Sequence, residues 1–450
     1  MAIVFVLVAL LVLAVIVTAN WYLWRRLFRD TTRGPGPVRR AGAVLVAGGW
    51  ALAITALVAE RSGAPFWLQQ VLAWPGFLWL ALSMYLVLAV LAGELVRPLL
   101  RRFLERRDRA KEQGAQAGSG TADSTRPEKV VVPEGAAASA AAGQEADPVP
   151  GGPGGPVQPP VGTDPSGTTS SPAPTGPSRR LFVSRVVAGA AAAAAVGTVG
   201  HGTYGVLRGP EVKRVTVPLA KLPRAAHGYR IAVVSDVHLG PVLGRGFAQK
   251  VVDTINSTQP DLIAVVGDLV DGSVKDLGPA AAPLAQLKAR HGSYFVTGNH
   301  EYFSGAGQWI EEVRRLGLDP LENARRELPH FDLAGVNDVA GEDEGQGPDF
   351  ARALGDRDTA RACVLLAHQP VQIHDAVDHG VDLQLSGHTH GGQLWPGNLL
   401  ASGANPTLAG LERYGDTQLY VSRGAGAWGP PTRVGAPSDI TVIELASRQA

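Results

Sequence analysis

The chain has 450 residues with 41 basic and 40 acidic side chains, so its formal net charge is only +1. A near-neutral chain argues against a strongly basic nucleic-acid-binding protein, because affinity for phosphate backbones requires clustered lysine and arginine. The single cysteine, Cys363, excludes a disulfide framework and a cysteine-based zinc site.

Three long apolar stretches lie within the first 110 residues, at 1–17, 41–59 and about 66–96. Each is close to the ~20 apolar residues that are needed to cross a bilayer. In the first stretch, Arg25 and Arg26 follow the apolar run, whereas the charge of a secretory signal peptide precedes it. A buried helix of a soluble protein would explain any one stretch. Three in succession instead predict a membrane region with three transmembrane helices over residues 1–110.

The charges between these stretches predict an orientation. Only Glu60 and Arg61 carry charge between the second and third stretches, whereas arginines crowd the other two connections. Because positively charged loops stay in the cytoplasm, we expect the N-terminus outside and the chain after residue 97 inside. The crowded arginines are Arg25, Arg26, Arg29, Arg33, Arg39 and Arg40, and then Arg97, Arg101, Arg102, Arg106, Arg107 and Arg109.

Residues 111–178 are rich in Gly, Ala, Pro, Ser and Thr and show no apolar period. Such a segment cannot bury enough apolar surface to offset its ordering entropy, so we predict a disordered linker. Arg179 and Arg180 then precede an apolar, Ala-rich run, which predicts over 179–205 either a fourth transmembrane helix or a twin-arginine-like export signal. An Ala-rich soluble helix is the alternative. Either membrane interpretation places residues 206–450 outside the cytoplasm.

The last part of the chain alternates short apolar runs with helical periodicity, which predicts an α/β domain over 206–450. Polar residues just beyond the carboxyl ends of strands in such sheets converge on a ligand site. The expected strands are 231–235, 262–266, 293–297, 332–336, 362–367, 381–385, 417–422 and 439–445.

Five of these runs end in residues that are typical metal ligands. Their nitrogen and oxygen donors, without sulfur, suit Mn, Fe or catalytic Zn. Seven such ligands exceed the needs of one ion and match two. The ends read Asp236-Val-His238, Gly267-Asp268, Gly298-Asn299-His300-Glu301, Ala367-His368 and Gly387-His388-Thr389-His390.

This series resembles the calcineurin-like metallophosphoesterase superfamily, and its flanking residues resemble the bacterial membrane-associated branch, over about residues 215–446. The resemblance implies a four-layer αββα sandwich, in which two packed sheets are flanked by helices, and two divalent metal ions (Mn, Fe or Zn). It also implies that His300 donates a proton or contacts phosphate, and that Ser235, Asp271 and Glu301 support the ligands. The implied ligands are Asp236, His238, Asp268 and His390 for the first ion, and Asp268, Asn299, His368 and His388 for the second.

We therefore predict a multi-pass, membrane-tethered phosphoesterase that hydrolyses phosphomonoesters or phosphodiesters with metal-activated water, on the outer face of the membrane. The alternatives are a nuclease or nucleotide phosphodiesterase of the same fold, and a non-catalytic metal-binding sensor. Nearness to the membrane suggests lipid-linked or cell-envelope substrates, and we expect no nucleic-acid partner. Trp395 and Trp428 either line a substrate cleft or cap a core.

Overall fold

The computed structural model describes residues 2–119 and 179–448. The chain divides into two compact units. One consists of Met1–Val96 together with Ser184–Ala450, and the other is Arg97–Val183. The described residues of the second unit are the end of helix α3 and the beginning of helix α4, in which Arg179 and Asp108 form an ion pair at 3.0 Å.

Four helices in the described part of the chain are long and apolar enough to cross a membrane. They are α1 (Ala2–Trp24), α2 (Pro37–Arg61), α3 (Phe66–Ser119) and α4 (Arg179–Leu207). A short π-helical turn, Arg25–Arg29, continues α1. These helices contain the three predicted apolar stretches and the Ala-rich run after Arg180.

The end of α3 differs from the predicted boundary at residue 110, because the helix continues to Ser119. Residues 101–115 are mostly Arg, Glu, Lys, Ala and Gln, which have high helix propensity, and this propensity extends the helix into the predicted linker. The remainder of the predicted linker, 120–178, lies outside the described residues.

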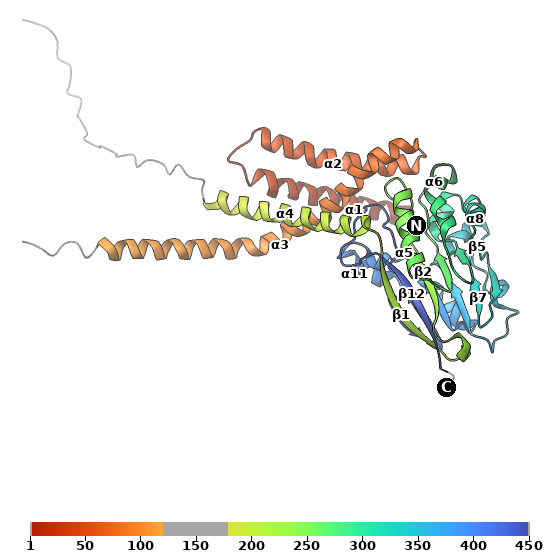
Figure 1. Ribbon diagram of the computed structural model, residues 1–450. Coiled ribbons are helices and arrows are strands. Elements are labelled where there is room, and N and C mark those ends of the chain that lie inside the picture. The colour runs from red at the N-terminus through yellow and green to blue at the C-terminus, as the bar shows by residue number, and fades with distance from the viewer. Residues whose placement is uncertain (1, 120–178, 449–450) are drawn as a thin grey trace, which may run out of the picture. The chain divides into compact units, whose positions relative to one another are not determined.

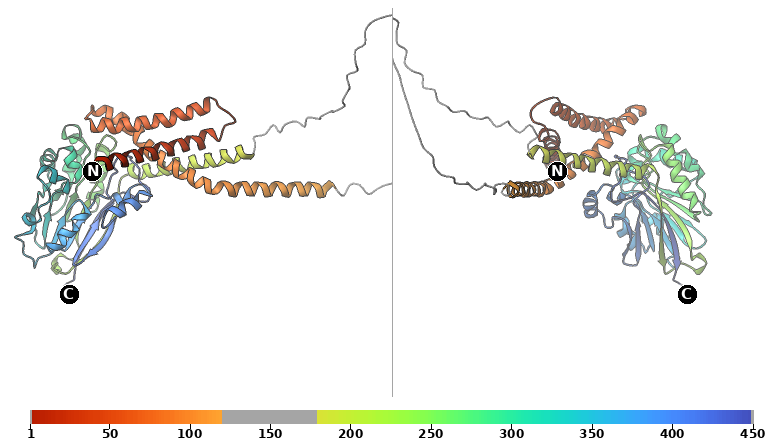
Figure 2. Two further views of the ribbon diagram at one scale, coloured as in Figure 1. Left: turned by 180° about the vertical axis from the view of Figure 1, so that it is seen from behind. Right: turned by 60° about the vertical axis from the view of Figure 1, so that its left-hand side comes forward.

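Within the first unit, the four helices, whose ribbons are seen from two sides in Figure 2, contribute to one buried apolar cluster. Leu23 of α1, Ala53 of α2, Trp79 of α3 and Ala195 of α4 are members of it. Small residues permit close approach of the helices, as membrane helix interfaces require. A Cβ atom at Gly76 of α3, for example, would lie 2.9 Å from the Ala56 Cβ on α2.

Two six-stranded sheets form the frame of the α/β region (Figure 1). In the first sheet the order is β1 (Glu211–Leu219), β12 (Asp439–Ser447), β2 (Tyr229–Val234), β3 (Leu262–Val266), β4 (Ser293–Val296) and β5 (Asp319–Pro320). In the second sheet it is β10 (Gly410–Tyr414), β11 (Thr417–Val421), β9 (Leu383–Ser386), β8 (Cys363–Leu366), β7 (Asp332–Gly335) and β6 (Ala324–Glu327).

The two sheets pack face to face, with helices on both outer faces. Ile231 of the first sheet and Leu385 of the second belong to one apolar cluster between them. Val251 and Trp309 cover the first sheet from α5 (Arg245–Ser257) and α8 (Ala306–Arg315), while Ile373 of α10 (Ile373–Asp378) covers the second. The fold prediction, a four-layer αββα sandwich, is confirmed. The other helices are α6 (Val274–Ala281), α7 (Asn299–Ser304), α9 (Phe350–Leu354) and α11 (Gly397–Ala404).

Parallel pairing brings the ends of several strands to one edge. Strands β2, β3 and β4 run parallel in adjacent positions, and so do β8, β9 and β11 in the other sheet. The residues that follow these strands therefore meet across the carboxyl edges of both sheets, where α/β proteins bind ligands.

Candidate metal centre

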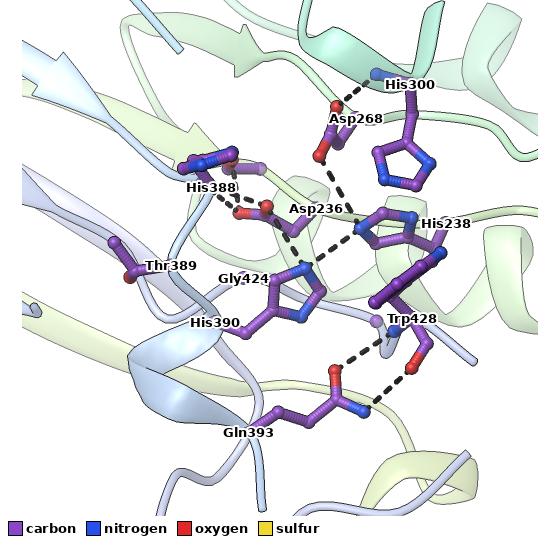
Figure 3. Close-up of polar contacts among 12 residues, drawn as sticks. Asp236, His238, Asp268, His300, His388, Thr389, His390, Gln393, Gly424 and Trp428 are labelled. Carbon is purple, nitrogen blue, oxygen red and sulfur yellow. Dashed lines mark hydrogen bonds and ion pairs between the residues drawn. The ribbon is translucent and has the colours of Figure 1, made fainter. Parts of the chain in front are cut away.

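Every predicted metal ligand lies in a loop at this shared edge or at the start of a helix there. Asp236 and His238 follow β2, Asp268 follows β3, and Asn299 begins α7 after β4. From the second sheet, His368 follows β8, and His388 and His390 follow β9. The side chains gather in two adjoining groups, and Figure 3 labels five of the ligands, Asp236, His238, Asp268, His388 and His390.

Asp236, His238 and His390 form the first group, and all three are buried. The Nε2 atoms of His238 and His390 are 2.9 Å apart. The same atom of His390 is 3.4 Å from an Asp236 carboxylate oxygen. Two imidazole nitrogens and a carboxylate oxygen thus converge on a common point, as the donors of a metal site do.

The second group contains Asp268, His368 and His388. Asp268 Oδ2 is 3.1 Å from His368 Nε2, and the Asn299 amide oxygen is 3.0 Å from His388 Nδ1. Asp268 Oδ2 is also 3.8 Å from His238 Nε2 in the first group. Asp268 therefore lies between the two groups, in the position of a shared ligand.

The state of the His368 ring fits a metal ligand. Its Nδ1 lies 2.8 Å from the carbonyl oxygen of Val266, so Nδ1 carries a proton and Nε2 is the ring nitrogen that faces Asp268. Nε2 is buried and makes no hydrogen bond to any described residue. An unsatisfied nitrogen that faces a carboxylate is expected where a cation binds. With hard or borderline donors and no sulfur, this site suits a divalent ion.

The backbone at these ligands is strained. Five of the seven predicted ligands have positive φ, a conformation that residues other than glycine rarely adopt. Strained backbone conformations of this kind are common at functional sites, where the surrounding fold holds the side chains in place. The five are Asp236, His238, Asp268, His388 and His390.

Glu301 holds the Asp268 loop in place. Its fully buried carboxylate accepts hydrogen bonds from the backbone amides of Asp268 (3.0 Å), Leu269 (2.8 Å) and Gly298 (2.6 Å). Gly298 is needed beside it, because a Cβ atom there would collide with the Asp268 carboxylate. These contacts give Glu301 the supporting position that the sequence suggested for it.

A third group links His300 to the ligands through Asp271. His300 Nδ1 and His238 Nδ1 lie 2.6 and 3.0 Å from Asp271 Oδ1. Asp271 thus orients His238 so that Nε2 faces the first group, and it fixes the ring of His300 beside that of His238, 4.8 Å away between ring centroids. The His300 ring is partly exposed, and its Nε2 is the atom left for contact with a ligand.

Charge at this edge favours cations. Burial raises the pKa of the Asp236 carboxyl, and the charge of Asp268 acts in the same direction. Burial would also raise the pKa of Asp268, but His368 and His238 outweigh it and hold that pKa well below its usual range. Burial lowers the pKa of His300, and the hydrogen bond to Asp271 outweighs this effect and raises it. Several carboxylates buried together are stabilised by a bound cation.

One functional residue was missed by the sequence analysis. Arg433 is fully buried and donates to the backbone carbonyls of His390 (3.0 Å), Ala436 (3.1 Å) and Gly426 (2.6 Å). It therefore fixes the His390 loop against the loop after β11. Its position in a Gly/Pro-rich segment far from His390 in sequence carries no motif that could have revealed it.

The two tryptophans of uncertain role lie at the surface. The indole of Trp428 is 5.7 Å from the His300 ring, and Gln393 bonds both the amide and the carbonyl of Trp428. Trp395 and Trp428 are both about half exposed, so neither caps a core. Trp428 thus forms a wall of the site (Figure 3).

Comparison with known proteins identifies the family. The model of the calcineurin-like phosphoesterase family matches residues 229–392, which include every predicted ligand and His300. A transmembrane protein with metallophosphoesterase domain from Danio rerio is 38% identical over 259 residues, 54% of this chain and 59% of the relative. An uncharacterized metallophosphoesterase from Campylobacter jejuni is 38% identical over 248 residues, 54% of this chain and 65% of the relative.

The chain thus spans less than two thirds of the length of these two relatives. It spans nearly all of an uncharacterized metallophosphoesterase from Bacillus subtilis, which is 30% identical over 280 residues, 60% of this chain and 98% of the relative. Together with the ligand geometry, these similarities show that the chain belongs to the calcineurin-like metallophosphoesterase family.

Proposed function

We propose that this protein is a membrane-tethered phosphoesterase that uses two divalent metal ions to hydrolyse phosphomonoesters or phosphodiesters outside the cytoplasm. The observation that carries the proposal is the meeting of seven nitrogen and oxygen donors in two groups that share Asp268. Membership of the family implies a hydrolase of phosphoesters.

The residues divide between the two ions as follows. Asp236, His238 and His390 would hold the first, His368, His388 and Asn299 would hold the second, and Asp268 would serve both. Two ions held in this way would neutralise phosphate oxygens and lower the pKa of a water molecule for in-line attack. Asn299 is a neutral ligand, so it leaves the charge of its ion less compensated than a carboxylate would.

His300 is the proposed proton donor to the leaving oxygen. Asp271 holds Nδ1, which leaves Nε2 to pass the proton. Burial lowers the pKa of His300, but the hydrogen bond to Asp271 outweighs it and raises that pKa, the direction that favours a proton donor. An alkoxide is a strong base, and its departure requires such a proton. The backbone amide of His300 also donates to Asp268 Oδ1 at 2.9 Å, so the donor and the bridging ligand are positioned together.

The orientation rests on which ends of the membrane helices carry arginine. At one end, Arg26 pairs with Glu94 at 3.0 Å and Arg185 donates to the carbonyl of Thr31 at 2.9 Å. At the other end, Val206 belongs to the core of the α/β domain and Phe66 packs against it. Arginine-rich ends of membrane helices stay in the cytoplasm. The position of the α/β domain at the opposite ends therefore supports a catalytic domain on the outer face.

Hydrolysis assays on the full-length protein test the proposal. We expect the Mn²⁺-loaded protein to release nitrophenolate from 4-nitrophenyl phosphate, from ethyl 4-nitrophenyl phosphate or from both, and the chelator-treated protein to release none. Equal rates with and without metal, or no hydrolysis of either ester after loading with Mn²⁺, Fe²⁺ or Zn²⁺ in turn, would contradict it.

A further inference from the structure

The segment after the ligand His390 carries an exposed apolar surface. Trp395, Leu399 and Leu400 have exposed fractions of 52%, 66% and 82%. They lie on helix α11 and the turn before it, and residues 391–410 contain no Asp, Glu, Lys or Arg. Adjacent apolar side chains without charge mark contact with a membrane, a ligand or another protein. We call these three residues the Trp395–Leu400 surface.

This surface is joined to a membrane helix. The hydroxyl of Tyr85 on α3 donates to the carbonyl oxygen of Trp395 at 2.8 Å. Leu394, next to Trp395, packs against the buried cluster of the membrane helices. The Trp395–Leu400 surface is therefore continuous with the side of the helix bundle, where the natural neighbour is hydrocarbon.

The position of Tyr85 along α3 gives the depth of the contact. Tyr85 lies nine residues before Glu94, which pairs with Arg26 at the arginine-rich end of the helices. Nine residues of helix span about 14 Å, and the hydrocarbon core of a bilayer is about 30 Å thick. If Glu94 and Arg26 mark one boundary of the hydrocarbon, the Trp395 carbonyl lies near its middle. Backbone polar groups at such a depth need a hydrogen-bond partner within the protein. The Tyr85 hydroxyl is that partner for the Trp395 carbonyl.

A second set of contacts joins the same segment to the metal centre. Gln393 donates to the Trp428 carbonyl at 2.9 Å and accepts from its amide at 3.1 Å. The Trp428 ring lies 5.7 Å from His300, and Phe303, which is also exposed, lies 5.7 Å from it on α7. Exposed apolar side chains thus flank His300. Gln393, which bonds to Trp428 (Figure 3), couples the Trp428 loop to the turn that carries Trp395.

We propose that the Trp395–Leu400 surface lies in the hydrocarbon of the outer leaflet and that the substrate is a phosphoester carried on a membrane lipid. The phosphate reaches the metal centre past Trp428, while the hydrocarbon chain stays against Trp395, Leu399 and Leu400. A lipid substrate then need not leave the bilayer completely. This inference rests on the proposed function and adds the class of substrate.

Two diesters with the same reacting group test the substrate class. Hexadecyl and ethyl 4-nitrophenyl phosphate differ only in their alkyl chains, and both react with water to give nitrophenolate and an alkyl phosphate. We would reconstitute the full-length protein in phosphatidylcholine vesicles and measure kcat/KM for each. We expect the hexadecyl ester to be preferred, and the double variant L399S/L400S to lower the ratio of the two values about tenfold, or about 1.4 kcal/mol.

The control is Leu411→Ser, which changes an exposed leucine on the edge strand β10. It should leave the ratio as it is in the unaltered protein. Hydrolysis of the ethyl ester without a chain-length preference, or a ratio that L399S/L400S does not change, would overturn the inference and leave the proposed function intact. Failure of the unaltered protein to hydrolyse the ethyl ester after metal loading would instead contradict the diesterase activity itself.

A spectroscopic measurement tests the membrane contact without any turnover. A nitroxide attached to Leu400→Cys in the vesicle-bound protein should be more accessible to oxygen, which concentrates in hydrocarbon, than to a water-soluble nickel complex. A nitroxide at Leu411→Cys is the control, and the opposite preference is expected for it. Preferential access of the nickel complex to position 400 would overturn the inference, whether because the surface faces water or because another protein covers it.

Discussion

At the candidate metal centre, we propose that some residues hold ions and that others act beside them. Asn299 and His300 are neighbours in sequence, yet the amide oxygen of Asn299 faces His388, whereas His300 is bonded to Asp271. Mutation at these two positions should therefore have different consequences, and the difference tests the proton donor.

His300→Ala leaves every proposed ligand in place, so metal content should be retained. General acid catalysis is worth about 10²–10⁴-fold in rate. We expect the loss to be large for alkyl esters, whose alkoxide needs a proton, and much smaller for nitrophenyl esters of the same type, at equal metal occupancy. An equal loss for both leaving groups would reject His300 as the acid and favour a role in phosphate contact.

Glu301→Gln tests the support of the Asp268 loop. The carboxylate accepts three backbone hydrogen bonds, and an amide must place its NH₂ group against at least one of those donors. An unsatisfied buried group costs about 1–3 kcal/mol in the free energy of unfolding, which thermal or chemical unfolding would measure. Glu311→Gln is the control, because Glu311 is exposed and its pair with Arg314 lies at the surface. An equal free energy of unfolding for the two variants would show that the Glu301 hydrogen bonds do not stabilise the fold by this amount.

Most of the site could be predicted from sequence because each ligand follows a short apolar run in a recognisable motif. The sequence does not show which residues Asp271, His300 and Trp428 contact, because these contacts join loops that are far apart in the chain. The structure shows them. Arg433 could not be predicted, because it acts on the carbonyl of His390, which is 43 positions earlier in the chain.

At the level of elements, the buried strands were predictable and the edge strands were not. Strands β3, β4 and β8 are short runs of buried apolar residues, which periodicity reveals. Strands β6 and β10 lie at sheet edges and are mostly exposed, so their composition resembles that of loops. Helix α3 continues beyond the predicted apolar stretch to Ser119, because residues of high helix propensity follow that stretch.

Strand β8 contains the single cysteine, and its thiol provides a test of burial. Cys363 is fully buried, and burial raises the pKa of its thiol to about 12. At pH 8 only roughly 10⁻⁴ of such a thiol is thiolate, the reactive form. We expect no reaction with an aromatic disulfide reagent in the folded protein and one thiol per chain after unfolding in guanidinium. Rapid reaction of the folded protein at pH 8 would show that this strand is not in the core.

For the whole molecule, the membrane orientation follows from the distribution of arginine and can be tested with reporter fusions. A phosphatase reporter fused after residue 210 should be active outside the cytoplasm, whereas a fusion at residue 140 should be inactive. Equal activity at the two positions would contradict the outer-face location. Replacement of Arg179 and Arg180 by Lys in the fusion at 210 would block export only if the twin-arginine route is used.

Counting metal ions in the purified full-length protein tests whether the chain holds two ions that share Asp268 as a ligand. Elemental analysis after loading and desalting should find about two divalent ions per chain, the number that a two-metal site requires. Asp268→Ala removes the bridging ligand and should lose both ions, whereas Asp319→Ala, which changes a partly exposed aspartate paired with Arg326, should keep them. A metal content that is the same in Asp268→Ala as in the unaltered protein would contradict a two-metal site that shares Asp268.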